Sequence, residues 1–200
     1  METYININPN RETLVLLGAI SIGVLGLIYY IKLSWKHYGM LFLMSAFIGN
    51  ILCFLFVNFG FYTFPYRLLP KLSEMPIIAV TITFPLLVLV GVRYSPKPWP
   101  WKIPFYWTII HVGIFLETIM LTGTRLIEYQ FKWDLWDSYT WWWIYFLIFE
   151  WIGGMIVPEH LRKPLQIRHL TYGKIGWFLI HFILIITIFL GGYYLGLTQQ

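Results

Sequence analysis

The chain has 200 residues, of which 58% are hydrophobic, 20% aromatic and only 12% charged, with a formal net charge of +5. A soluble domain carries about a quarter charged residues, so this composition excludes an ordinary soluble protein. The basic residues flank apolar segments instead of forming one basic face, which argues against a nucleic-acid-binding protein. We therefore predict an all-α, polytopic membrane bundle that forms a single domain over residues 1–200.

Six apolar segments are each long enough to cross the hydrocarbon core of a bilayer, which takes about 20 helical residues. They cover residues 13–32, 40–58, 76–94, 104–122, 139–157 and 175–196. The first segment is longer than the apolar region of a cleavable signal peptide, and polar residues with two Glu and one Arg precede it. We therefore expect it to be a retained first helix.

The distribution of Lys and Arg predicts the orientation of these six spans. If the N-terminus is outside, the cytoplasmic side carries nine basic residues: Lys32, Lys36, Arg93, Lys97, Lys102, Arg162, Lys163, Arg168 and Lys174. The outer side then carries five: Arg11, Arg67, Lys71, Arg125 and Lys132. Because cytoplasmic loops are enriched in Lys and Arg, both termini are expected outside.

Two of the connections on the outer side are long, residues 60–76 and 124–143, and both are rich in aromatic residues. Aromatic rings gather at the membrane interface, so these connections predict an aromatic belt, or a lid over the outer half of the bundle. The cytoplasmic stretch "SPKPWPWKIP", residues 95–104, has four prolines. It predicts an extended, stiff connection.

Ionisable residues within the apolar segments are the candidates for catalysis, because each costs roughly 2.5–3.5 kcal/mol at the bilayer centre. They are Glu150, His111 and Glu117. Measured from the outer ends of their predicted helices, His111 lies about 18 Å and Glu150 about 16 Å deep, so we expect the two to pair near the midplane. His111 and Glu117 point about 120° apart around their helix, and no metal or other cofactor is predicted.

A second group of residues is expected to bind a ligand. It consists of polar and aromatic residues within the apolar segments, together with one tyrosine of the first outer connection: Asn50, His181, Trp143, Trp151 and Tyr62. Gly153 and Gly154 follow Glu150 closely and would let another helix approach its face. Glu150 is then either protonated or paired, and the simplest explanation of it is an interhelical hydrogen bond that fixes packing.

The stretch "GFYTFPYRLLP", residues 60–70, followed by Trp133, Trp136, Ser138 and Tyr139, carries a resemblance. It resembles a family of small multi-pass membrane proteins of spore-forming bacteria, with a Gly-x-Tyr-x-Phe-Pro turn and a Trp-containing stretch before a helix. The similarity spans roughly residues 40–150, and the C-terminal part with "VPEHLRKP" departs from it. The resemblance implies a bacterial plasma membrane and supplies no activity.

Three functions are compatible with these residues. The first is a non-catalytic envelope component that binds a lipid or a protein partner. The second is an enzyme on an isoprenoid or another lipid, with Glu150 as general acid and His111 or Glu117 returning the proton. The third is a component of a proton-coupled transporter, with His and Glu at staggered depths. The expected partners are membrane lipids, a hydrophobic small molecule and further copies of the chain.

Overall fold

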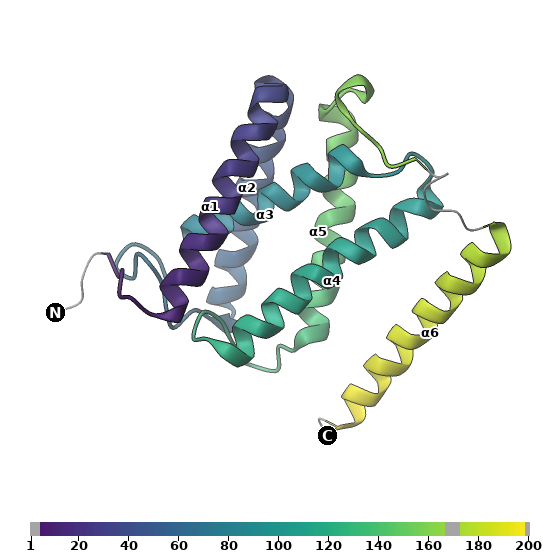
Figure 1. The fold of residues 1–200 in the computed structure, drawn as a ribbon. Coiled ribbons are helices and arrows are strands. Elements are labelled where there is room, and N and C mark those ends of the chain that lie inside the picture. The colour runs from purple at the N-terminus through teal and green to yellow at the C-terminus, as the bar shows by residue number, and fades with distance from the viewer. Residues whose placement is uncertain (1–4, 167–172, 199–200) are drawn as a thin grey trace.

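The computed structural model describes residues 5–166 and 173–198. Within them lie six α-helices, two short strands and one 3₁₀ helix (Figure 1). In chain order these are α1 (Arg11–Leu33), α2 (Trp35–Asn58), β1 (Tyr62–Thr63), α3 (Ile77–Tyr94), α4 (Trp99–Gly123), β2 (Glu128–Tyr129), α5 (Leu135–Ile156), η1 (Glu159–Leu161) and α6 (Lys174–Thr198). Each of the six predicted helices is therefore present.

The predicted helix boundaries differ most at the starts of α2 and α4, each of which begins five residues earlier than predicted. The expectation of an extended connection over residues 95–104 was wrong for its second half, which is the first turn of α4. Pro98 is the N-cap of α4, and Pro100 lies in the first turn, where a residue without an N–H loses no helical hydrogen bond. This shift makes Lys102 a helical residue.

Four of the helices, α1 to α4, are long and apolar enough to cross a membrane. α5 falls below the same criterion because it contains five Trp, two Tyr and several charged or small polar residues among its apolar ones. In α6, the described apolar stretch is shorter, Ile180–Phe189. Length and composition therefore support a membrane protein with four candidate spans, and they do not establish the count of six.

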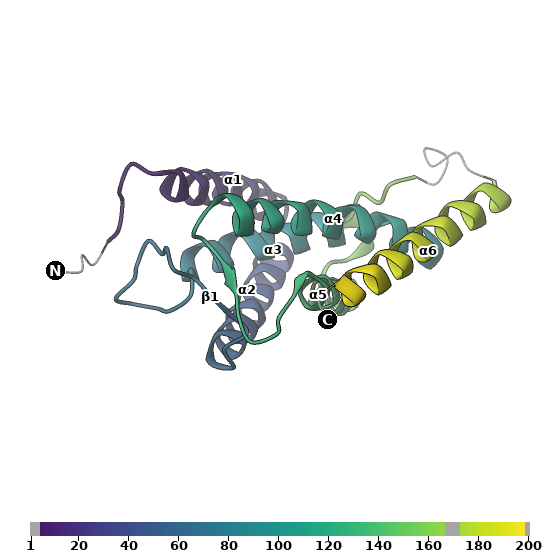
Figure 2. The same cartoon turned by 90° about the horizontal axis from the view of Figure 1, so that it is seen from below.

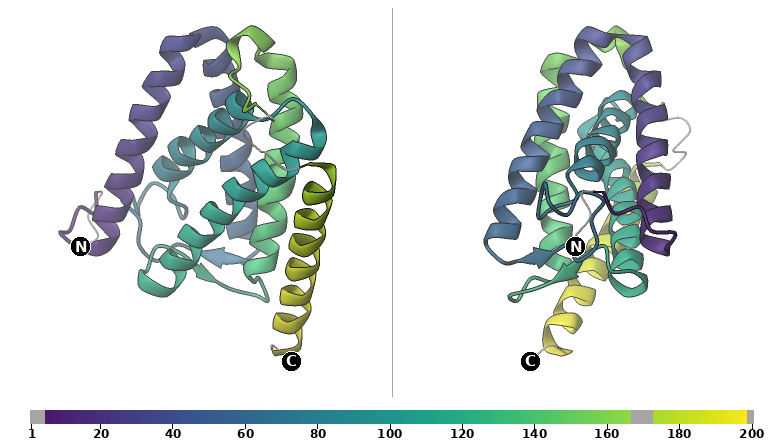
Figure 3. Two further views of the ribbon diagram at one scale, coloured as in Figure 1. Left: turned by 45° about the vertical axis from the view of Figure 1, so that its right-hand side comes forward. Right: turned by 90° about the vertical axis from the view of Figure 1, so that its left-hand side faces the viewer.

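α3 is the central helix of the bundle and packs against α1, α2, α4 and α5 (Figure 1). The side chains that bury completely belong mostly to these helices: Tyr38, Leu41, Val88, Leu89, Ile110, Phe146 and Phe149. α1 and α2 form a hairpin through a tight turn at Ser34, whose N–H donates to the carbonyl of Tyr30. α6 lies on one side of the molecule, next to α4 and α5 (Figures 2 and 3).

The two long connections meet at one end of the bundle, as predicted for two segments on the same side of a membrane. β1 pairs with β2 in antiparallel register, with Tyr62 opposite Tyr129. Trp133 stacks on Phe61 at 4.9 Å between ring centroids and is itself buried. Part of the expected aromatic belt therefore packs inward and joins the two connections to each other. We call this the loop end of the bundle.

At the opposite end, the chain after α5 is held against α2 and α3. The carbonyl of Leu161 accepts hydrogen bonds from the Tyr38 hydroxyl, at 2.7 Å, and from the Arg93 guanidinium, at 2.8 Å. The N–H of Lys163 donates to the carbonyl of Arg93. The predicted basic connection thus begins as an ordered strap across this end, while its Arg168 lies outside the described residues.

Gly153 confirms the prediction that a glycine after Glu150 lets a neighbouring helix approach. A Cβ placed there would lie 2.7 Å from Cγ1 of Val92 on α3, closer than real Cβ contacts allow. At Gly154, a Cβ would meet only the guanidinium of Arg162, at 3.5 Å. The close contact between α3 and α5 therefore depends on Gly153 and not on its neighbour.

We expect Gly153→Ala to destabilise the protein by about 1–3 kcal/mol, because the added methyl group overpacks the contact with Val92. Gly154→Ala is the matched control, and its effect should stay within about 0.5 kcal/mol. Thermal unfolding of the two variants in the same detergent measures the difference. Equal midpoints for both variants would show that α3 and α5 do not pack closely at this position.

Candidate functional site

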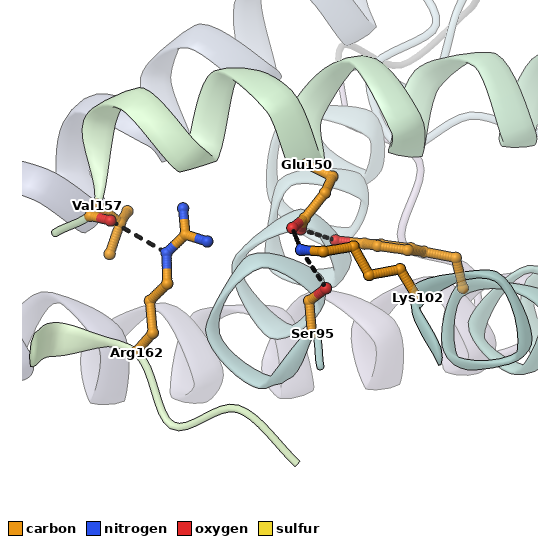
Figure 4. A network of polar contacts seen from close by, with 6 residues as sticks. Ser95, Lys102, Glu150, Val157 and Arg162 are labelled. Carbon is orange, nitrogen blue, oxygen red and sulfur yellow. Dashed lines mark hydrogen bonds and ion pairs between the residues drawn. The ribbon is translucent and has the colours of Figure 1, made fainter. Parts of the chain in front are cut away.

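Glu150 is 3% exposed and lies in α5, facing α3 and α4 (Figure 4). Its Oε1 forms an ion pair with Nζ of Lys102, and its Oε2 accepts a hydrogen bond of 2.5 Å from the Tyr106 hydroxyl. Nζ of Lys102 also donates to Oγ of Ser95, the C-cap of α3, at 3.2 Å. One buried carboxylate thus joins three helices.

The expected pairing of Glu150 with His111 is not formed. The His111 side chain is exposed, its Nδ1 donates to the carbonyl of Trp107 at 2.9 Å, and its ring contacts Trp107 and Tyr139. Glu150 is six residues from the end of α5, which places it about 9 Å from that end and not at the midplane. Lys102 and Tyr106 reach this level because α4 begins earlier than predicted.

The local backbone explains how the Glu150 site packs. Gly91 on α3 leaves room for the Tyr106 ring, since a Cβ at Gly91 would lie 2.9 Å from that ring. Nε of Arg162 donates to the carbonyl of Val157 at 3.0 Å, so a second cation lies beyond Glu150 on the same side (Figure 4). Glu150 is buried and lines neither of the two described cavities.

Glu117 forms a second buried carboxylate site, at the loop end of α4. It is 7% exposed and accepts three hydrogen bonds, all from uncharged donors. The donors are the hydroxyls of Tyr129 and Ser138, at 2.7 and 2.9 Å, and the indole N–H of Trp142, at 3.0 Å. Since Tyr129 belongs to β2 and the others to α5, Glu117 ties the connection between α4 and α5 to both helices.

The tyrosines of the two strands keep their hydroxyl protons. Burial, and then the nearby Glu117 carboxylate, raise the pKa of Tyr129 well above its usual value of 10. Burial, and then Cys53, raise the pKa of Tyr62 in the same direction. Tyr129 therefore stays a hydrogen-bond donor to Glu117 through the whole neutral range. Tyr62, predicted to bind a ligand, packs instead within the aromatic cluster of the loop end.

A groove of about 340 Å³ separates α6 from α4 and α5. We call it the α6 groove. α6 is held at both of its ends: the Trp177 indole N–H donates to the carbonyl of Pro100 at 3.3 Å, and Gly192 lies against the Trp136 ring. Between these contacts the groove is lined by Ile103, Pro104, Trp107, Tyr139, Trp143, His181, Leu184, Ile185, Ile188 and Phe189.

The α6 groove brings together two of the predicted ligand-binding residues, Trp143 and His181. The other predicted residues lie elsewhere. Asn50 donates to Thr81 Oγ1 at 2.9 Å and links α2 to α3, and Trp151 is 66% exposed and lines neither described cavity. Among the described residues, no group of three or more His, Cys, Asp or Glu side chains is arranged to hold a metal ion.

No protein-family model, curated protein or solved structure matches the chain.

Several residues of these sites carry signals that sequence reasoning missed. Lys102 and Tyr106 are four residues apart, so a helix that starts at Trp99 puts both on one face, toward a single partner. Asp134 and Asp137 form a capping box that sets the start of α5, which in turn fixes Ser138 and Trp142 toward Glu117. No local sequence signal identifies Tyr129 as a donor to Glu117, because that contact depends on how the connection folds back.

We expect Lys102→Met to destabilise the protein by about 3–5 kcal/mol, because it leaves the Glu150 carboxylate buried without a cation. The double variant Lys102→Met with Glu150→Gln should recover more than half of that loss, since the glutamine is uncharged and still accepts from Tyr106. Denaturation of the single and double variants in matched detergent measures both effects. Additive losses would mean that the two side chains do not interact.

We expect Glu117→Gln to destabilise the protein by about 1–3 kcal/mol. The amide has only one oxygen for three donors, so at least one charge-assisted hydrogen bond is lost. Glu128→Gln is the matched control, because Glu128 is exposed on the adjacent strand β2. Thermal unfolding gives the stability, and near-ultraviolet circular dichroism reports the packing of Trp142. An unchanged Glu117→Gln protein would show that this network does not stabilise the loop end.

Proposed function

We propose that the protein is a non-catalytic, multi-pass membrane protein that binds a lipid or another apolar molecule in the α6 groove. The groove itself is the observation that carries the proposal. Its volume lies in the range of about 300–1,000 Å³ that small-molecule sites occupy, and its wall is mostly aliphatic and aromatic. Phe189 and Ile185 on its rim are 68% and 63% exposed, so the groove is accessible from the side of the bundle that would face lipid.

We further propose a bacterial plasma membrane in which all six helices span the bilayer and both termini lie outside. The pairing of β1 with β2 supports one common side for the two long connections. The basic residues Arg93, Arg162 and Lys163 gather at the opposite end, in agreement with a cytoplasmic position. Many apolar side chains of α1 and α2 are exposed, which supports contact of these helices with lipid or with another copy of the chain.

Catalysis by Glu150 on a lipid receives less support from the geometry. A general acid needs a proton that its substrate can reach. The carboxylate of Glu150 is engaged by Lys102 and Tyr106, and it does not line the α6 groove. A proton path through His111 and Glu150 is likewise less favoured, because His111 is exposed and bonded within its own helix.

The binding proposal is tested by filling the groove. Leu184→Trp places a large ring among the lining residues, whereas Ile186→Trp, two positions further on, is a matched control because Ile186 does not line the groove. We expect native mass spectrometry of gently purified protein to show an apolar adduct on the wild type and on Ile186→Trp. The adduct should be reduced at least tenfold on Leu184→Trp. Equal occupancy of all three proteins, or none on any, would contradict the proposal.

A further inference from the structure

His181 is the one strongly polar side chain of the α6 groove whose ring is nine-tenths buried. Its Nδ1 lies 2.7 Å from the carbonyl oxygen of Trp177, and since a carbonyl only accepts, Nδ1 holds the hydrogen of that bond. In the uncharged form of the ring, Nε2 then carries the lone pair and is an acceptor. That atom is buried and has no hydrogen-bond partner among the described residues. A buried acceptor in this state requires a donor from elsewhere.

The facing wall of the groove offers donors. The indole N–H of Trp107, which can only donate, is buried and without a hydrogen-bond partner in the described part of the chain. The hydroxyl of Tyr139 lies close to the indole N–H groups of Trp107 and Trp143, and it is buried without a partner in full hydrogen-bond geometry among the described residues. His181 on α6, whose Nε2 is this acceptor, thus shares with Trp107 on α4 and Tyr139 on α5 the lining of a groove that is otherwise apolar.

We propose that the ligand of this groove is a neutral lipid with a hydroxyl head group, an inference that rests on the function proposed above. A hydroxyl both donates and accepts, so it can satisfy Nε2 of His181 and also receive a hydrogen bond from the opposite wall. A ketone, ester or ether oxygen only accepts and would leave Nε2 of His181 without a donor. Among the described residues that line the groove there is no Asp, Glu, Lys or Arg, so a charged head group would find no permanent counter-charge there.

The position of His181 is fixed by its own helix. Its ring stacks on Trp177 at 4.1 Å between centroids, with an interplanar angle of 27°. α4 contains the same Trp-x-x-x-His pattern, in which His111 bonds the carbonyl of Trp107 and contacts its ring at 4.1 Å. His111, however, is exposed and does not line the groove. The two histidines therefore share local geometry and differ in burial, which makes His111 the matched control.

The test compares an alcohol with its methyl ether, in which a methyl group replaces the donating hydrogen. The protein is placed in nanodiscs of dioleoylphosphatidylcholine, a lipid without a hydroxyl group. Farnesol and farnesyl methyl ether are titrated at equal mole fractions in the bilayer, and binding is followed by tryptophan fluorescence and native mass spectrometry. Dioctanoylglycerol and its methyl ether form a second arm, which distinguishes an isoprenoid alcohol from a diacylglycerol as the source of the hydroxyl.

We expect the wild type to bind at least one of the two alcohols about tenfold more tightly than its ether, the factor that one hydrogen bond to a buried acceptor provides. His181→Phe should bind alcohol and ether equally, and His111→Phe should keep the preference. Equal binding of alcohol and ether by the wild type would overturn the hydroxyl inference and leave lipid binding intact. If no probe bound, both the hydroxyl inference and the proposal of lipid binding would be overturned. The comparison of alcohol and ether on the wild type does not depend on whether any variant folds.

Discussion

The ion pair between Glu150 and Lys102 is the contact on which the arrangement of α3, α4 and α5 depends. A carboxylate or an ammonium alone at this position would be costly, and each is acceptable only because the other is adjacent. Tyr106 and Ser95 complete the set of partners, so the site joins the start of α4 and the end of α3 to α5. Gly91 and Gly153 then allow the close helix contacts that keep water out. The role of Glu150 in packing three helices together is enough to explain why a carboxylate is buried here, and no catalytic role is needed.

The two buried carboxylates are stabilised in different ways, and the difference follows from their positions. Glu150 pairs with a cation, Lys102, in the first turn of α4. Glu117 has only neutral donors, which come from a folded connection and the first turns of α5. Removing a neutral donor from Glu117 weakens one bond of three, whereas removing Lys102 leaves a charge without its counterion. The loop end should therefore tolerate substitution better than the Glu150 site.

The sequence was sufficient for the class of protein, the six helices and the close approach at Gly153, because these depend on composition, on apolar length and on a missing side chain. It was insufficient for the partners of Glu150. The predicted depths start from the outer helix ends, and α5 begins at Leu135 instead of residue 139, which moves Glu150 about 6 Å further from that end. Lys102 lay outside the predicted helix, so it was not considered as a partner. Trp143 and His181 were correctly singled out, yet their meeting across the α6 groove depends on tertiary packing that no local pattern encodes.

The buried polar groups of this molecule differ in whether the protein itself supplies all of their hydrogen-bond partners. Glu150 and Glu117 accept hydrogen bonds from the protein at both of their oxygens, and neither lines a described cavity. His181 has one ring nitrogen bonded and the other buried without a partner. Native proteins rarely bury an unsatisfied polar atom beside a cavity without a use for it. The ionisable residues that first attract attention thus hold the bundle together, and the half-satisfied histidine of α6 is the residue on which the proposed hydroxyl recognition rests.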